Sequence, residues 1–240
     1  MIQMKPHPRS LLLVLTFTLF FGAFSPALYG ETWYITSLDW APYSDSKAKD
    51  QGFLIKRLRD ILKSKNIELM VEFYPWFRAK ALAQNKEYVG YFPAWPEEVE
   101  KGFLASHPVG WSKIALIANS KYTSTETDLK TLIQKNLICS VRTYTYPKII
   151  TKLLNRNKQN VLAYANEEAM ARALSNQLCS IAITDPKVVL FNAKKQGITN
   201  LQVVHAELYR KELVLSFRNE ADNVAKIKLL NLAIEQFKEK

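Results

Sequence analysis

Short apolar runs typical of strands alternate along the chain with segments in which apolar residues recur every three or four positions. The strand candidates are TWYITSL, ELMVEFY, YVGYFPA, KIALIAN, LICSV, CSIAIT, LQVVH and ELVLSF. The segment 52–66 has helical spacing, with Phe53, Leu54, Leu58, Ile61 and Leu62 on one face. Strands that alternate with helices in this way predict an α/β fold with largely parallel sheets.

The amino terminus has the pattern of a secretory signal. Lys5 and Arg9 precede an apolar run from Leu11 to Phe24, and small residues follow up to Gly30. The run is shorter than the roughly 20 residues that a membrane-spanning helix needs. We therefore predict a cleaved signal peptide over residues 1–30 and a periplasmic location, with an uncleaved anchor as the alternative.

The charge balance is basic, with 33 Lys and Arg against 22 Asp and Glu and a net charge of +11. The cations are scattered among carboxylates, as in IKRLRDILKSKNIE, and form no single stripe. A nucleic-acid partner is therefore not expected. The remaining chain of about 210 residues is long enough for one large domain or two small ones, each with its own core.

Two cysteines, Cys139 and Cys179, each stand at the start of a strand candidate. An oxidising compartment allows a disulfide between them, and two buried free thiols are the alternative. No CxxC motif is present, and His107 and His205 lack a partner at ligand spacing. The sequence therefore predicts neither a metal site nor a cofactor.

Large aromatic residues and a cation follow the first three strand candidates. They lie in SLDWAPYSD, PWFRA and PAWPEE, and comprise Trp40, Tyr43, Trp76, Arg78 and Trp95. Ligands of such sheets bind beyond the carboxyl ends of the strands, so these side chains are expected at one edge. The rings could enclose a ligand and Arg78 could pair with an anionic group. The alternative is that each ring caps the core locally and that Arg78 is solvated.

These motifs carry a resemblance to a known family. APYS, GF, PWFRA, FPAWPEE and FLASHPVGWSKIALIA occur in the order seen in bacterial periplasmic solute-binding proteins of family 3, the amino-acid-binding type. DLKTLIQKNLICSVRTYTYP, LCSIAITDPKVVLFNAKK and ELVLSFRNEADNVAKIKLLNLAIEQF resemble its later segments. The resemblance implies a two-lobed periplasmic-binding-protein-like fold of type II, with lobe one at 31–115 and 206–240 and lobe two at 116–205. The crossings between the lobes are expected near ALIAN and VVHAE.

The resemblance also assigns ligand contacts, with one departure. Glu98 stands where the family has an Arg that clamps the ligand carboxylate, so Arg78 or Arg142 would have to replace it. Arg142 and Tyr144 occupy a turn that meets the ligand in the family, and Asp185 matches an Asp that pairs with a ligand ammonium. Asp185 also precedes a proline, as a helix N-cap does, and both roles can coexist if one oxygen caps.

The function implied is that of a receptor that closes around a small polar, amino-acid-like ligand with an apolar portion. Its partner would be an inner-membrane ABC permease, or a membrane sensor for which the protein is an adaptor, and we expect a monomer. An enzyme on the same fold, of the dehydratase kind, is a further alternative. The sequence contains no GxSxG or HExxH motif, so we expect no catalysis, although Glu97, Glu98 and Asp185 could meet in the cleft.

Overall fold

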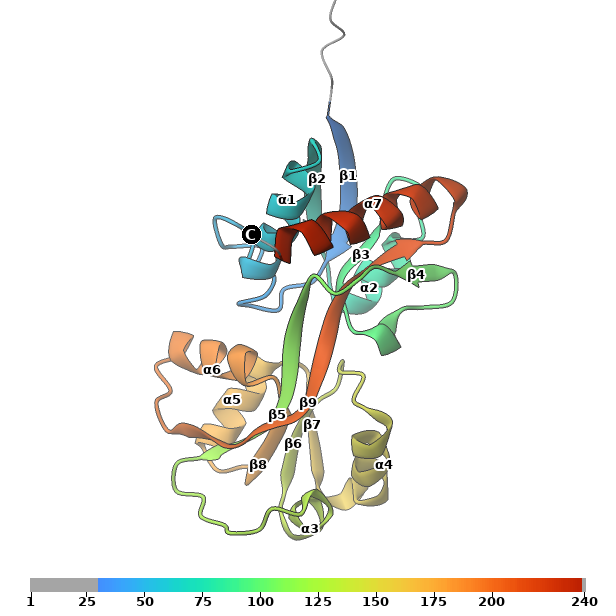
Figure 1. Ribbon diagram of the computed structural model, residues 1–240. Coiled ribbons are helices and arrows are strands. Elements are labelled where there is room, and N and C mark those ends of the chain that lie inside the picture. Colours follow the sequence, from blue (N-terminus) through green and yellow to red (C-terminus); the bar gives the residue numbers. More distant parts are fainter. Residues whose placement is uncertain (1–29, 239–240) are drawn as a thin grey trace, which may run out of the picture.

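The computed structural model describes residues 30–238, which form two α/β lobes placed one above the other (Figure 1). The strands are β1 (Glu31–Ser37), β2 (Ile67–Phe73), β3 (Gly90–Ala94), β4 (Phe103–Ala105), β5 (Gly110–Asn119), β6 (Ile138–Val141), β7 (Val161–Tyr164), β8 (Ile181–Thr184) and β9 (Leu201–Arg218). The helices are α1 (Phe53–Lys63), α2 (Trp76–Leu82), α3 (Leu129–Lys135), α4 (Lys148–Arg156), α5 (Glu167–Ser175), α6 (Pro186–Lys195) and α7 (Ala221–Lys238), with short 3-10 turns at Pro96–Glu98 and Lys158–Asn160. The predicted two-lobed α/β fold is confirmed, whereas the predicted signal peptide lies outside the described residues except for Gly30.

Lobe one is built on strands in the order β2-β1-β3-β9, with β4 also paired to β9. β1 runs parallel to β2 and β3, and β9 runs antiparallel to β3. Helix α1 contacts β2 and α7, while α2 contacts β1 and β3. The carboxyl ends of β1 and β3 therefore open onto the same edge of the sheet, which faces lobe two (Figure 1).

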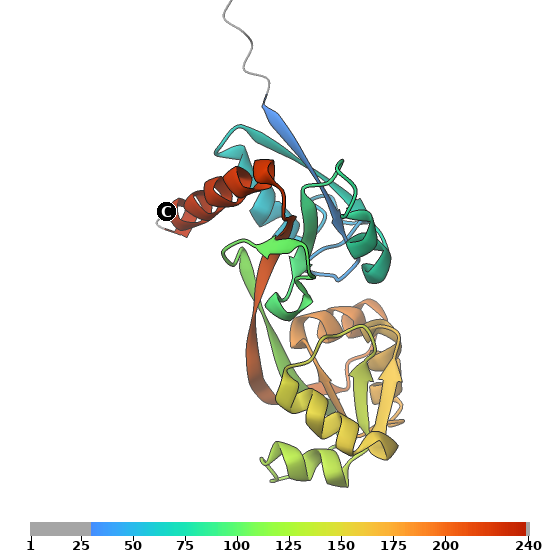
Figure 2. The same cartoon turned by 90° about the vertical axis from the view of Figure 1, so that its right-hand side faces the viewer.

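Lobe two is built on strands in the order β5-β8-β6-β7. β6 is parallel to both β7 and β8, and β8 is antiparallel to β5. The helices α3 to α6 surround this sheet (Figure 2). The lobe thus has a parallel centre, as the alternation of strands and helices predicts.

The two lobes are joined by the long strands β5 and β9. They form an antiparallel ladder from Gly110 opposite Leu213 to Asn119 opposite Leu201, with register shifts near Leu116. β9 continues into lobe one, where it pairs with β3. The connection is therefore a two-stranded ribbon, and the lobe bounds expected from the sequence stay a prediction.

The apolar face of α1 is buried, with one difference from the expected pattern. Leu54, Leu58, Ile61 and Leu62 are buried as expected, but Phe53 is 44% exposed. Phe53 is the first residue of the helix, and its ring lies 4.9 Å from the ring of Tyr43 instead of in the core.

Among residues 30–238, no helix is both long and apolar enough to cross a bilayer.

The predicted disulfide is confirmed. Cys139 on β6 and Cys179 just before β8 are bonded, with their Cα atoms 5.8 Å apart. Both are buried in a cluster with Met170, Leu174 and Val189. The bond ties β6 to the chain entering β8 and closes a loop that contains α4, β7 and α5.

We expect the double substitution Cys139→Ala/Cys179→Ala to lower the free energy of unfolding by about 2–4 kcal/mol, because the unfolded chain is no longer constrained by the loop. Urea denaturation measures this loss. Reductant should destabilise the wild-type protein by a similar amount and leave the variant unchanged. Identical urea midpoints for the variant and the oxidised wild-type protein would contradict a stabilising role.

Candidate functional site

A cavity of about 420 Å³ lies between the lobes and is lined by both. Lobe one contributes the segment after β1, the start of α2 and the segment after β3. Lobe two contributes the turn after β6 and the start of α5. The side chains that characterise this interlobe cavity are Trp40, Trp76, Trp95, Tyr144, Glu98 and Glu167.

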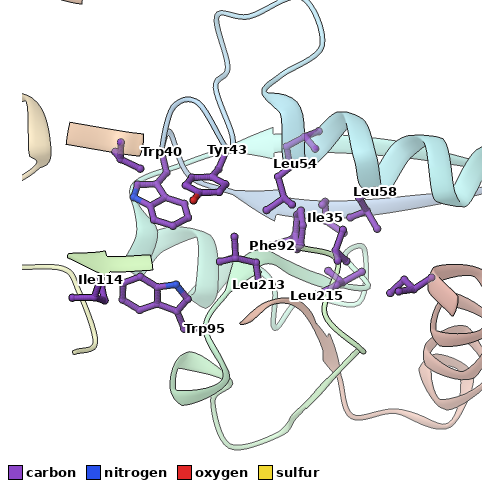
Figure 3. Close-up of a cluster of buried hydrophobic side chains, with 14 of the residues drawn as sticks. Ile35, Trp40, Tyr43, Leu54, Leu58, Phe92, Trp95, Ile114, Leu213 and Leu215 are labelled. Carbon is purple, nitrogen blue, oxygen red and sulfur yellow. The ribbon is translucent and has the colours of Figure 1, made fainter. Parts of the chain in front are cut away.

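The segment after β1 is a tight turn that presents two stacked rings. The backbone N–H of Trp40 donates to the carbonyl oxygen of Ser44 at 2.8 Å, and the N–H of Tyr43 donates to the carbonyl oxygen of Trp40 at 3.0 Å. The rings of Trp40 and Tyr43 are stacked with centroids 4.4 Å apart. Figure 3 shows both rings at the end of the lobe-one core, with Trp95 facing them.

Two tryptophans hold Glu98 at the wall of the cavity. The indole N–H of Trp76 donates to Oε1 of Glu98 at 3.2 Å, and the backbone N–H of Trp95 donates to Oε2 at 3.1 Å. The Trp95 indole is itself fixed by a 2.8 Å hydrogen bond to Oγ of Ser112 on β5. Burial raises the pKa of Glu98, although these donors and the nearby Lys80 and Lys211 oppose the shift.

Glu167 connects the lobes through Trp40 and Tyr144. The Trp40 indole N–H lies 2.9 Å from both Oε1 of Glu167 and the hydroxyl of Tyr144, and the Tyr144 hydroxyl donates to the same carboxylate oxygen. The ring of Tyr144 also packs edge-on against Trp95, with centroids 4.8 Å apart. Burial raises the pKa of both Glu167 and Tyr144. Side chains of the two lobes therefore meet in one hydrogen-bonded aromatic cluster.

Asp185 is fully buried and forms a second contact between the lobes. Its Oδ1 accepts from the backbone N–H groups of Lys187 and Val188, so it caps α6. Its Oδ2 accepts from the backbone N–H of Lys113 at 3.1 Å and from the hydroxyl of Tyr43 at 3.0 Å. These bonds use about all the acceptor positions of a carboxylate. One oxygen of Asp185 therefore caps α6, as the helix-cap interpretation predicts. The other oxygen accepts from the Tyr43 hydroxyl, where the resemblance predicted a ligand ammonium.

Tyr43 and Asp185 do not line the interlobe cavity. They line a second hollow of about 530 Å³, beside Lys113, Lys187 and Arg210. The residues of the single site expected from the sequence are thus distributed over two separate cavities.

Neither predicted arginine lines the interlobe cavity. Arg78 is exposed, with its guanidinium carbon 5.3 Å from the centroid of the Tyr74 ring. Helix α2 turns Trp76 and Ala79 inward, and at 100° per residue this leaves Arg78 on the outer face. Arg142 is also exposed, and its Nη2 donates to the carbonyl oxygen of Ala163. The anion-holding role predicted for these arginines has no support from their positions.

The sequence did not single out Glu167 as a site residue. It forms an acidic pair with Glu168 in the first turn of α5, directly after the N-cap Asn166, and such a pair is typical of a helix start. In the structure Glu167 is 6% exposed, whereas Glu168 is exposed and pairs with Arg172. No sequence signal separates these neighbours, because the choice depends on which one faces lobe one.

The charged residues that line the interlobe cavity have one sign. Asp39, Glu98 and Glu167 are among the lining residues, which include no Lys, Arg or His. Within residues 30–238, no group of three His, Cys, Asp or Glu is placed to hold a metal ion. The aromatic walls can therefore stack on an apolar body, and the carboxylates can accept hydrogen bonds.

We expect Tyr43→Phe to shift the protein toward a more open arrangement of the lobes. The substitution removes the hydroxyl that donates to Asp185 across the lobes and keeps the ring. A hydrogen bond to a charged group contributes about 1.5–3 kcal/mol. Its loss would change the ratio of closed to open protein by about tenfold or more. Small-angle X-ray scattering should show a larger radius of gyration.

Tyr146→Phe is the matched control for Tyr43→Phe. The Tyr146 hydroxyl bonds only within lobe two, to the backbones of Val141 and Ile183. The radius of gyration of the Tyr146→Phe protein should equal that of the wild-type protein. An unchanged radius for Tyr43→Phe as well would show that this bond does not hold the lobes together.

We expect Glu167→Gln to reduce the loss of stability as the pH rises. Burial raises the pKa of Glu167 above its ordinary value of 4.5, so the folded protein binds this proton more tightly than the unfolded chain. The contribution to stability is present at low pH and is lost as the pH rises above 4.5. Urea denaturation at a series of pH values should give a flatter dependence for Glu167→Gln than for the wild-type protein or for the exposed neighbour, Glu168→Gln. Parallel curves for all three proteins would contradict the shift.

Comparison with family models and with curated protein sequences finds no match. Comparison of structures finds many. A histidine kinase sensor domain with similarity to periplasmic binding proteins matches with a TM-score of 0.72 at 12% identity, covering 88% of this chain and 92% of that one. The GluR0 ligand-binding core from Nostoc punctiforme, in complex with L-glutamate, matches with a TM-score of 0.67 at 18% identity, covering 86% and 93%.

A third structure is an arginine transport-system periplasmic binding protein from Legionella pneumophila. It matches with a TM-score of 0.66 at 16% identity, covering 88% of this chain and 95% of that one. Nearly the whole length of each structure corresponds to the two lobes described above. The chain therefore has the two-lobed fold of periplasmic binding proteins.

Proposed function

We propose that this protein is a periplasmic solute-binding receptor that closes around a small polar, amino-acid-like ligand and presents it to an ABC importer. The observation that carries the proposal is the interlobe cavity of about 420 Å³, whose aromatic walls come from both lobes. Its volume falls in the range of small-molecule sites. The apolar walls with a few polar groups are also typical of such sites.

Ligand binding would act through the β5–β9 ribbon. A ligand between Trp95 of lobe one and Glu167 of lobe two contacts both walls only when the lobes are closed. Such a ligand binds the closed form better and shifts the population toward it. The importer can then distinguish loaded from unloaded protein by the relative position of the two lobe surfaces.

Two features of the chain support the proposed location. The N-terminal pattern of Lys5, Arg9 and an apolar run is that of an export signal. The disulfide between Cys139 and Cys179 fits an oxidising compartment. Both observations support a periplasmic protein.

A sensory adaptor for a membrane receptor is the second candidate, and the fold shared with a histidine kinase sensor domain favours it. The two candidates use the same cavity and differ in the partner that contacts the closed lobes. Neighbouring genes for a permease and an ATPase would support import, and a neighbouring signalling gene would support sensing.

We propose binding without catalysis. Asp185 accepts from Tyr43 and from three backbone N–H groups, so it is not free to act as a base. Incubation of a bound compound with the protein, followed by mass spectrometry, should recover the compound unchanged. Conversion of the compound would contradict this proposal and indicate that the protein is an enzyme.

A thermal-shift screen of residues 31–240 against amino acids, amines, organic acids, short peptides and sugars tests the proposed function. A ligand at 100 times its dissociation constant adds about 2.7 kcal/mol, which raises the melting temperature by roughly 5–10 °C. Trp76→Ala should abolish this rise, measured from the variant's own melting temperature without ligand. Trp111→Ala is the control, since Trp111 lies outside the interlobe cavity. A screen without any hit, or hits unaffected by Trp76→Ala, would refute the proposed site.

A further inference from the structure

The interlobe cavity combines aromatic walls with carboxylates on opposite lobes. Glu98 belongs to the turn after β3 in lobe one, and Glu167 begins α5 in lobe two. Trp40, Trp76, Trp95 and Tyr144 line the space with them. A ligand in this space therefore meets negative charge from both sides and ring faces around it.

Aromatic ring faces attract cations, most strongly where water is excluded. The protein already uses two of these rings in this way. Nζ of Lys211 lies 4.6 Å from the centroid of Trp95, and Nζ of Lys80 lies 5.8 Å from that of Trp76. The electron-rich character of the walls is thus visible in the protein's own contacts.

These two lysines lie near Glu98, but each is paired with another carboxylate and neither lines the cavity. Lys211 is 4% exposed and its Nζ lies 2.7 Å from Oε2 of Glu97. Lys80 pairs with Glu100 at 2.6 Å. Neither cation is among the lining residues, so a carboxylate on a ligand would meet Glu98 and Glu167 without a positive side chain lining the space. Repulsion between carboxylates in a site of low dielectric disfavours such a ligand.

A cationic ligand reverses this balance. Burial makes the charged forms of Glu98 and Glu167 unfavourable and raises their pKa. A positive charge placed between them would favour the ionised carboxylates and gain charge-assisted hydrogen bonds if it carries N–H groups. Because the carboxylates belong to different lobes, the same charge would also draw the lobes together.

We propose that the interlobe cavity binds an organic cation, an ammonium group on an apolar body, that carries no carboxylate. This inference rests on the proposed receptor function and changes its ligand from an amino-acid-like compound to an amine without a carboxylate. Glu98 and Glu167 supply the opposite charge, and Trp40, Trp95 and Tyr144 enclose the body.

The test uses ligands that share a body and differ only in charge. The probes are phenethylamine, phenylalanine and 3-phenylpropanoate, then tryptamine, tryptophan and indole-3-propionate, and choline with its neutral isostere 3,3-dimethylbutan-1-ol. Isothermal titration calorimetry of residues 31–240 should detect binding of at least one cation. The matching amino acid or neutral isostere should bind at least about tenfold more weakly, and the acids should not bind.

Glu167→Gln tests the role of charge without removing a hydrogen-bond acceptor. The amide oxygen can still accept from Trp40 and Tyr144, so a purely structural role predicts unchanged affinity. Loss of a charged partner should instead weaken binding of the cation by roughly 10- to 100-fold. Glu168→Gln, the exposed neighbour that pairs with Arg172, should bind as the wild-type protein does.

The outcomes separate this inference from the proposed function. If an amino acid or an acid binds more tightly than its amine, and Trp76→Ala abolishes this binding, the inference of a cationic ligand is wrong. The proposed receptor function is still supported in that case. Equal affinity of the cation for Glu167→Gln and the wild-type protein would also overturn the inference. Absence of binding across these probes and the wider screen would overturn both.

Discussion

The pairing of β5 with β9 is the constraint on which the rest of the molecule depends. One strand of the ladder, β9, also pairs with β3 in lobe one, and the other, β5, pairs with β8 in lobe two. The lobes can therefore change their relative angle only by bending or twisting this ribbon. Register shifts near Leu116 interrupt the regular ladder and give the strands a local irregularity there.

The same aromatic residues complete the core of lobe one and form the surface that meets lobe two. Trp40, Tyr43 and Trp95 belong to one buried cluster with Leu54 and Ile114 (Figure 3). Their indole and hydroxyl groups are directed to partners on β5 or in lobe two, since a buried N–H or O–H without a partner is unfavourable. Core packing thus fixes the orientation of the rings, and hydrogen bonding fixes their polar ends.

The carboxylates in the contact between the lobes oppose the stability of the fold at neutral pH. Burial raises the pKa of Glu98, Glu167 and Asp185, so each disfavours the folded state at neutral pH relative to a neutral isostere. For Asp185, hydrogen bonds from the backbone N–H groups of the helix that it caps offset this cost. Glu167 accepts instead from the side chains of Trp40 and Tyr144. Carboxylates with pKa values shifted by burial cluster at functional sites in proteins. The overall charge of +11 gives no indication of these buried carboxylates, because a net charge sums all residues whatever their burial.

The sequence by itself determined the parts of the structure that depend on local or periodic patterns. Alternating strands and helices predicted the α/β fold, and the carboxyl ends of neighbouring strands brought Trp40, Trp76 and Trp95 to one edge. The Asp185–Pro186 pair predicted a helix cap, because capping needs only the first turn of the helix. Only the tertiary structure decided that Cys139 and Cys179 approach closely enough to bond. It also decided that Arg78 faces outward and that Glu167, rather than its neighbour Glu168, enters the cavity. These outcomes depend on the rotation of each helix against its sheet and on the ribbon that sets one lobe over the other, and no local pattern of residues encodes either.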